Sequence, residues 1–326
     1  MTLIPPQTTL AIFGSLKVGH VMPCLGVARA LGVEPQMRPV APRKIYMSLG
    51  PWSPADPRDP ALSEPYPDIV IASGRETVPY LRAIKKRSGG RTFTVYLGDP
   101  HATRYCFDLI CVPEHDRLRG ANVMATLTSP HPRNCAELNI VRDNPDPRIA
   151  NLAAPRIALL LGGPSGNYRF EPADILEITA IAANILTSGA SLMISPSRRT
   201  PGALMESLRA TIQLASKDIA SRAFIWDGTG DNPYPSMLAL ADAFVVTTDS
   251  VNMIGECVAT GKPVHVYEPS GHAGKFAHFI DGLLQRLIIR PWSGRIEEWD
   301  YEPLDSTPSI AREIAERFSV FKAARR

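Results

Sequence analysis

The sequence predicts an α/β protein with two doubly wound, Rossmann-like parallel sheets. Short runs of aliphatic and β-branched residues alternate with helical stretches in both halves of the chain. Several of these runs are apolar without interruption, which is typical of parallel strands covered by helices on both faces. The chain has 326 residues, more than a single hydrophobic core usually holds. Because the strand–helix alternation occurs twice, we expect two sheets, each with its own core.

The predicted elements follow one another in a regular order. In the first half, strands are expected at residues 9–13, 68–73, 92–97, 107–112 and 122–127. In the second half, they are expected at 156–162, 191–195, 223–226, 243–248 and 263–268. The clearest helix lies at 172–189, where isoleucines form one stripe and Gly189 ends the pattern. A proline-rich polar stretch at 143–156 has the composition of a linker. We therefore expect an N-terminal domain at 1–150, a C-terminal domain at 151–305, and a terminal helix at 306–326 that packs back across the domain boundary.

Composition excludes several classes of protein. A net charge of +3 is too small for the domain-wide excess of basic residues that nonspecific nucleic-acid binding requires. No apolar run reaches the roughly 20 residues of a membrane helix, and the N-terminus lacks the basic and apolar parts of an export signal. The 5 cysteines are an odd number without a CxxC pair, so neither a disulfide framework nor a zinc ribbon is predicted. We expect a cytoplasmic protein.

The turn after the first predicted strand carries a candidate catalytic residue. Gly14 and Gly19 allow a tight turn with close backbone approach. His20 follows at the entrance of a predicted helix, whose first turn we expect to hold Pro23. Backbone N–H dipoles at a helix start favour the neutral imidazole, which can accept a proton. His20 is therefore a candidate general base, and a histidine that caps a turn is the alternative interpretation.

Turns after three predicted strands of the second half have the composition of an anion site. A glycine-rich turn exposes backbone N–H groups, two adjacent arginines suit forked hydrogen bonds to a diphosphate, and small polar residues precede a helix carrying Glu256. Glu256 is a candidate ribose ligand, and Lys275 lies after a flexible loop where it would neutralise a leaving diphosphate. A tight turn, a solvated arginine pair and a solvated helix face are the structural alternatives. The nucleotide and phosphate candidates are Gly162, Gly163, Ser165, Gly166, Ser197, Arg198, Arg199, Asp249, Ser250, Asn252, Glu256 and Lys275. The loop expected to wall the nucleobase contains Gly230, Asn232 and Tyr234.

The sequence lacks the motifs of metal-dependent sugar transfer and of serine hydrolases. The sequence has no Asp-x-Asp pair, and its His, Cys and Asp residues lack the spacing of a recognisable metal site. We therefore expect no metal and no cofactor, with helix ends, arginine and lysine stabilising the leaving diphosphate. The GxSxG elbow of hydrolases does not occur either.

Longer motifs resemble known families. VGHVMPCLGVARALG, GGPSG and TDSVNMIGECVATGKPVHVYEP are similar to loops of the GT-B glycosyltransferases, and of the bacterial lipid-linked N-acetylglucosaminyltransferases of peptidoglycan synthesis in particular. With ASGRETVPYLRAIKKRSGGRTF, PEHDRLRGANVMATL, SPSRRTP and FIWDGTGDNPY, the resemblance to the mitochondrial-fission "elongated mitochondria" family covers nearly the whole chain. The usual Thr-Asp-Gly opening of that family is here Phe13-Gly14-Ser15, so its aspartate is missing.

These resemblances imply a GT-B architecture and a metal-independent glycosyltransferase. A nucleotide-diphosphate sugar would be the donor, held by the second domain. A lipid-linked or envelope glycan would be the acceptor, with peripheral contact at the inner face of a membrane. Two alternatives stay open: a nucleotide-sugar epimerase of the same fold, and a non-catalytic adaptor in membrane or organelle fission.

Overall fold

The chain folds into two compact units. The computed structural model describes residues 2–14, 18–46, 50–102, 104–114, 116–133 and 135–325, apart from the side chains of Val18, Cys135, Ala136 and Lys275. One unit comprises Met1–Pro132 with Ser306–Arg326, and the other comprises Arg133–Asp305. No helix in the described part of the chain is long and apolar enough to cross a membrane.

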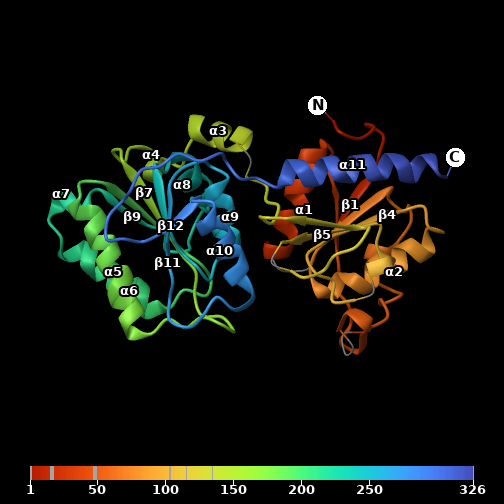
Figure 1. Cartoon of the computed structure of the whole chain (residues 1–326), viewed down its shortest axis with the longest axis horizontal. Coiled ribbons are helices and arrows are strands. Elements are labelled where there is room, and N and C mark those ends of the chain that lie inside the picture. The colour runs from red at the N-terminus through yellow and green to blue at the C-terminus, as the bar shows by residue number, and fades with distance from the viewer. Residues whose placement is uncertain are drawn as a thin grey trace. The chain divides into compact units, whose positions relative to one another are not determined.

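The first unit contains a parallel sheet, which within the described residues has the order β2-β1-β3-β4-β5-β6 (Figure 1). Its strands are β1 (Leu10–Gly14), β2 (Gln36–Pro39), β3 (Ile69–Ala72), β4 (Phe93–Leu97), β5 (Leu109–Pro113) and β6 (Val123–Thr126). The helices of this unit are α1 (Val18–Leu31), α2 (Val78–Arg87) and α11 (Thr307–Ala323). Short 3₁₀ turns are η1 (Lys44–Tyr46), η2 (Gly50–Trp52), η3 (Pro60–Leu62), η4 (Arg75–Thr77) and η5 (Arg104–Cys106).

Strand β1 shows how the first sheet is buried on both faces. Leu10 and Ile12 point into a core cluster that also contains residues of α1 and α11. Ala11 and Phe13, one residue out of step, point into the other cluster with residues of α2. Because side chains alternate along a strand, a run that is apolar at every position must be covered twice. The uninterrupted apolar runs of the sequence are thereby explained.

The second unit repeats this architecture, with the strand order β12-β11-β10-β7-β8-β9 among the described residues (Figure 1). Its strands are β7 (Arg156–Leu161), β8 (Ser191–Pro196), β9 (Ala223–Ile225), β10 (Ala243–Thr247), β11 (Val264–Tyr267) and β12 (Ile289–Pro291). Its helices are α3 (Cys135–Asp143), α4 (Pro147–Ala150), α5 (Pro172–Thr187), α6 (Gly202–Leu214), α7 (Lys217–Ala220), α8 (Tyr234–Leu240), α9 (Val251–Val258) and α10 (Ala277–Gln285), with the 3₁₀ turn η6 (Gly274–Phe276). The predicted fold class, two doubly wound parallel sheets, is confirmed.

The two units divide the chain at a different place from the sequence-based boundary at 150/151. Helices α3 and α4 belong to the second unit, so residues 143–156 lie inside that unit and do not link the two. Tertiary hydrogen bonds explain the difference. The Arg142 Nε donates to the Ala239 carbonyl at 2.9 Å, and the Asp146 N–H donates to the Ser236 hydroxyl at 2.9 Å.

Helix α11 is part of the core of the first unit. Its Ile310, Ile314 and Phe318 are buried in the same cluster as residues of α1 and β4 (Figure 1). The Phe318 and Phe321 rings meet Phe93 edge-on, at centroid distances of 5.9 and 5.1 Å. The sequence predicts that this terminal helix packs back across the domain boundary; in the structure it follows the second unit in the chain, and its apolar stripe is buried in the first unit.

Sequence patterns missed β2 and β12, each at one edge of its sheet, and misplaced the start of α1. An edge strand needs no continuous apolar run because one side of it faces no neighbour, and every residue of β2 is exposed or half-buried. Helix α1 begins at Val18, so Pro23 lies inside the helix and not in its first turn.

Candidate functional site

Three strand ends of the second unit lie side by side. Strand β7 pairs in parallel with both β10 and β8, so the carboxyl ends of all three strands meet at one edge of the sheet. The Gly162 N–H, directly after β7, donates to the Thr247 hydroxyl at the end of β10 at 2.8 Å. The Thr200 hydroxyl, after β8, donates to the Gly162 carbonyl at 2.5 Å. The three turns that the sequence singled out are therefore held together by hydrogen bonds.

The Asp249 carboxylate lies where these turns meet. Its side chain is fully buried, and its Oδ2 accepts the Gly163 N–H at 2.9 Å and an Arg199 N–H at 3.0 Å. The Ser250 hydroxyl lies 3.3 Å from the same oxygen. A side chain at Gly162 would collide with this carboxylate, and one at Gly163 would collide with the Arg199 backbone. Both glycines are therefore required by close packing around a buried negative charge.

Two of the predicted phosphate ligands already have partners inside the protein. The N–H of Gly163 is bound to Asp249. The Arg199 guanidinium, besides its ion pair with Asp249, donates to the carbonyls of Gly163 and Pro164 at 2.6 and 3.0 Å. An internal carboxylate thus occupies donors that the sequence assigned to a phosphate. In this structure, Arg199 and Gly163 fix the shape of the turn.

Other predicted phosphate ligands remain accessible. Arg198 is exposed, and no hydrogen-bond or ion-pair partner for it lies among the described residues. Ser250 is the N-cap residue of α9 but makes no side-chain cap hydrogen bond, and the first-turn N–H groups have no acceptor within the helix. Asn252 in that turn is exposed. Gly166 is exposed as well. An anion at this edge of the sheet would find one free guanidinium and one helix N-terminus.

Two further predicted residues shape the turns from within. The Ser165 hydroxyl accepts the N–H groups of Asn167 and Tyr168 at 3.3 and 3.2 Å, which closes the glycine-rich turn on itself. The Ser197 N–H donates to the Thr200 hydroxyl at 2.8 Å, which closes the arginine turn.

Tyr234 and Glu256, predicted to lie near the base and the ribose, are in contact. The Tyr234 hydroxyl donates to Glu256 Oε2 at 2.6 Å. Burial raises the pKa of Glu256 above its ordinary value of 4.5, although the Tyr234 hydrogen bond and the charge of Arg133 lower it in part. Burial, together with the Glu256 charge, raises the pKa of Tyr234. The Asn232 side chain accepts the Tyr234 N–H at 3.0 Å and so fixes the start of α8, and Gly230 has the positive φ of +67° that this loop needs.

The loop after β11 is tied to the glycine-rich turn by residues that the sequence reasoning missed. Asp174, in the first turn of α5, accepts the Tyr267 hydroxyl at 2.9 Å and the Ser270 N–H at 3.0 Å. Tyr168 forms an isolated β-bridge with Gly271. A capping box at the start of α5, in which Asp174 accepts the Glu171 N–H, is the sequence signal for one of these residues. Lys275 follows this loop, but its side chain lies outside the described residues.

The candidate catalytic residue His20 lies in the first unit, in the first turn of α1. Its Nδ1 is 3.7 Å from Glu76 Oε1, and a side chain at Gly74 would collide with the imidazole. Gly74 follows β3 and has a φ of +96°, a conformation that favours glycine. His20 is therefore placed at the carboxyl edge of the first sheet, between a glycine turn and a carboxylate.

Comparison with known proteins identifies the family. A family model described as "Mitochondrial fission ELM1" matches residues 18–318. The chain belongs to this family. It is 29% identical over 283 residues to the mitochondrial fission protein ELM1 of Arabidopsis thaliana, covering 77% of this chain and 65% of that protein's length. It is 26% identical over 288 residues to an uncharacterized protein of Rickettsia prowazekii (strain Madrid E), covering 76% of this chain and 79% of that protein.

Solved structures confirm the GT-B fold. The UDP-GlcNAc 2-epimerase of Methanocaldococcus jannaschii matches with a TM-score of 0.53 at 10% identity, over 96% of this chain and 100% of that one. The glycosyltransferase SnogD of Streptomyces nogalater matches with a TM-score of 0.51 at 15% identity, over 96% of both chains. At these identities the likeness concerns the fold alone. Within the described residues, no group of three or more His, Cys, Asp or Glu side chains is arranged to hold a metal ion.

Proposed function

We propose that this member of the ELM1 family is a glycosyltransferase that takes a nucleotide-diphosphate sugar without a metal ion. The observation that carries the proposal is the meeting of three strand-end turns around Asp249, beside a helix that carries a tyrosine-bound glutamate. Ligands of open α/β sheets bind outside the carboxyl ends of the strands. The edge described above is such a position, and its free groups are suited to an anion.

In this proposal, the donor residues have two kinds of task. Arg198 and the first-turn N–H groups of α9 bind the diphosphate, because they lack partners in the described part of the protein. Asp249 and Arg199 hold the turns in the binding shape and do not contact the donor. Glu256 accepts a ribose hydroxyl through Oε1, since its Oε2 is already bound to Tyr234.

Sugar transfer requires a general base, and His20 is the proposed one. An acceptor hydroxyl attacks the anomeric carbon, the bond from that carbon to the diphosphate oxygen breaks, and the hydroxyl proton passes to His20. Glu76 orients the imidazole and stabilises the imidazolium. The negative charge that develops on the leaving diphosphate is stabilised by the Arg198 guanidinium and the α9 N-terminus. The proposed acceptor is a lipid-linked or envelope glycan.

Two other functions are supported by particular observations. A nucleotide-sugar epimerase of the same fold is supported by the match to the Methanocaldococcus jannaschii enzyme, which has also been solved with UDP-GlcNAc and UDP. An adaptor role in organelle fission is supported by the description of the family. Sugar transfer leaves the ring protons in place, whereas epimerisation in deuterated water introduces deuterium at the inverted carbon. An adaptor keeps its biological role when Glu256 is replaced by Ala.

Donor binding can be tested by thermal unfolding with UDP, GDP, ADP and dTDP at millimolar concentration. A ligand at 100 times its Kd stabilises the folded protein by about 2.7 kcal/mol, so a clear rise in Tm is expected with at least one of them. Arg198→Ala and Glu256→Gln are expected to reduce that rise. Arg209→Ala, which removes an exposed arginine of α6, should leave it unchanged. If none of the diphosphates shifts the Tm, the donor site does not exist.

A further inference from the structure

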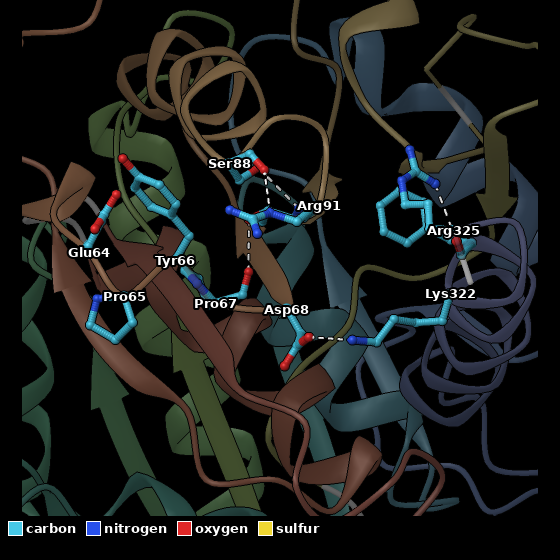
Figure 2. A pocket seen from close by; sticks show the side chains of 11 residues that line it. Glu64, Pro65, Tyr66, Pro67, Asp68, Ser88, Arg91, Lys322 and Arg325 are labelled. Carbon is cyan, nitrogen blue, oxygen red and sulfur yellow. Dashed lines mark hydrogen bonds and ion pairs between the residues drawn. The ribbon is translucent and has the colours of Figure 1, made fainter.

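Two sequence segments without a role in the proposed reaction meet in the first unit. The end of the motif at 72–93 and the end of α11 line one cavity of about 590 Å³ (Figure 2). Asp68 and Thr92, which also line it, directly precede β3 and β4. The cavity therefore lies at the amino ends of these parallel strands, whereas His20 and Gly74 lie at the carboxyl ends.

A glycine turn places Arg91 at this cavity. Helix α2 ends at Arg87, and Gly89 and Gly90, which follow its C-cap Ser88, have φ values of +61° and +78°. The Arg91 Nε then donates to the Ser88 carbonyl at 2.9 Å. Its two terminal NH₂ groups have no partner among the described residues, and Figure 2 shows the guanidinium between Tyr66 on one side and Arg325 on the other.

Arg325 brings a second guanidinium to the same turn. Its central carbon lies 3.7 Å from the centroid of the Phe321 ring, and one NH₂ group donates to the Phe321 carbonyl at 3.2 Å. The other NH₂ group would lie 3.9 Å from a Cβ at Gly90. Stacking on the aromatic ring fixes the plane of this guanidinium. Two guanidinium groups thus line the same cavity.

The carboxylates of the cavity do not neutralise this pair. The Asp68 carboxylate accepts a hydrogen bond from the Lys322 ammonium at 2.6 Å. It also accepts hydrogen bonds from the N–H and the hydroxyl of Thr9, at 3.0 and 2.9 Å. Glu64 is exposed and lies beyond Tyr66, on the side away from Arg325 (Figure 2). Within the described residues, the cavity therefore has two arginines without a carboxylate partner and one free carboxylate, Glu64, on the far side of Tyr66.

We propose that this cavity binds a small phosphate monoester with hydroxyl or amino groups on its other end. Two guanidinium groups are balanced by a dianion, which a phosphate monoester supplies near neutral pH and a single carboxylate does not. Guanidinium forks match the geometry of phosphate oxygens. The volume is within the range of small-molecule sites. Glu64 accepts hydrogen bonds from the hydroxyl or amino groups at the far end.

Calorimetric titration with inorganic phosphate and glycerol 3-phosphate tests the site. Both should bind, and Arg91→Ala should weaken each by about tenfold or more, because hydrogen bonds to charged groups are lost. Arg91→Lys, which keeps the charge but loses the fork, should give an intermediate affinity. Arg295→Ala, at an exposed arginine of the second unit, should bind like the wild type. Glu64→Gln should bind inorganic phosphate at least as tightly, because a repulsive charge is removed.

A second arm separates a free phosphate monoester from a lipid headgroup of the same chemistry. Phosphatidylcholine vesicles with and without phosphatidate are sedimented with the protein. Phosphatidate-dependent binding that Arg91→Ala abolishes, without binding of glycerol 3-phosphate, assigns the headgroup source. Binding of glycerol 3-phosphate assigns the free source. No binding in either arm, or binding that survives Arg91→Ala and Arg325→Ala, overturns the proposal. The nucleoside-diphosphate shift should be unchanged in Arg91→Ala, so the two sites fail independently.

Discussion

Gly162→Ala is the sharpest test of how the strand-end turns are held together. The new methyl group would overlap the Asp249 carboxylate, which is buried and cannot move into solvent. Overpacking costs about 1–3 kcal/mol. A displaced carboxylate also leaves the buried Gly163 N–H without its acceptor, which costs about 1–3 kcal/mol more. The lower chain entropy of alanine in the unfolded state returns about 0.4–1 kcal/mol. We expect the free energy of unfolding to fall by about 2–4 kcal/mol.

Urea unfolding followed by circular dichroism measures this change, with Gly166→Ala as the matched control. Gly166 belongs to the same turn, but a Cβ there meets nothing within 4 Å. The control should lie within about 0.5 kcal/mol of the wild type. Removing the carboxylate makes room for the methyl group, so Gly162→Ala should cost less in an Asp249→Ala background than in the wild type. If Gly162→Ala unfolds at the same urea concentration as the control, Asp249 does not organise these turns.

Three further predictions concern other parts of the chain. Phe318→Ala should lower the free energy of unfolding of the first unit by about 3–5 kcal/mol, because it leaves a cavity in the core. The control Val320→Ala, at a side chain that is 70% exposed, should change that free energy by less than about 0.5 kcal/mol, and urea unfolding compares the two variants. Gly74→Ala should destabilise the same unit by about 2–4 kcal/mol, because its φ is +96° and the methyl group overlaps the His20 imidazole, and an unchanged melting temperature would contradict that placement. Glu256→Gln should gain stability relative to the wild type as pH rises above about 4.5. The raised pKa of Glu256 means that the folded wild type binds the proton more tightly than the unfolded chain, so the wild type loses stability on ionisation; a pH-independent difference in urea unfolding would refute this.

The sequence by itself determined the fold class and most of the central strands. Parallel strands that are covered on both faces are apolar at nearly every position, and short stretches such as residues 156–162 and 243–248 show this pattern. Glycine turns and arginines after those stretches predict an anion site, and the strand ends that carry them lie at one edge of the sheet because the strands are parallel. Strands β2 and β12 were missed because they are short and carry no continuous buried run, whereas β6 and β9 at the opposite edges were predicted.

Only the tertiary structure decided which donors at that edge are free. Asp249 is distant in sequence from Gly163 and Arg199, yet its carboxylate takes the N–H of one and an N–H of the other, and no local pattern encodes such a contact. The same holds for α11, whose stripe of Ile310, Ile314 and Phe318 predicts a buried helix but not the surface that buries it. The spacing of apolar residues along the sequence indicates which side chains are buried, because each buried position must itself be apolar. The partner is decided by packing between segments that meet only when the chain has folded.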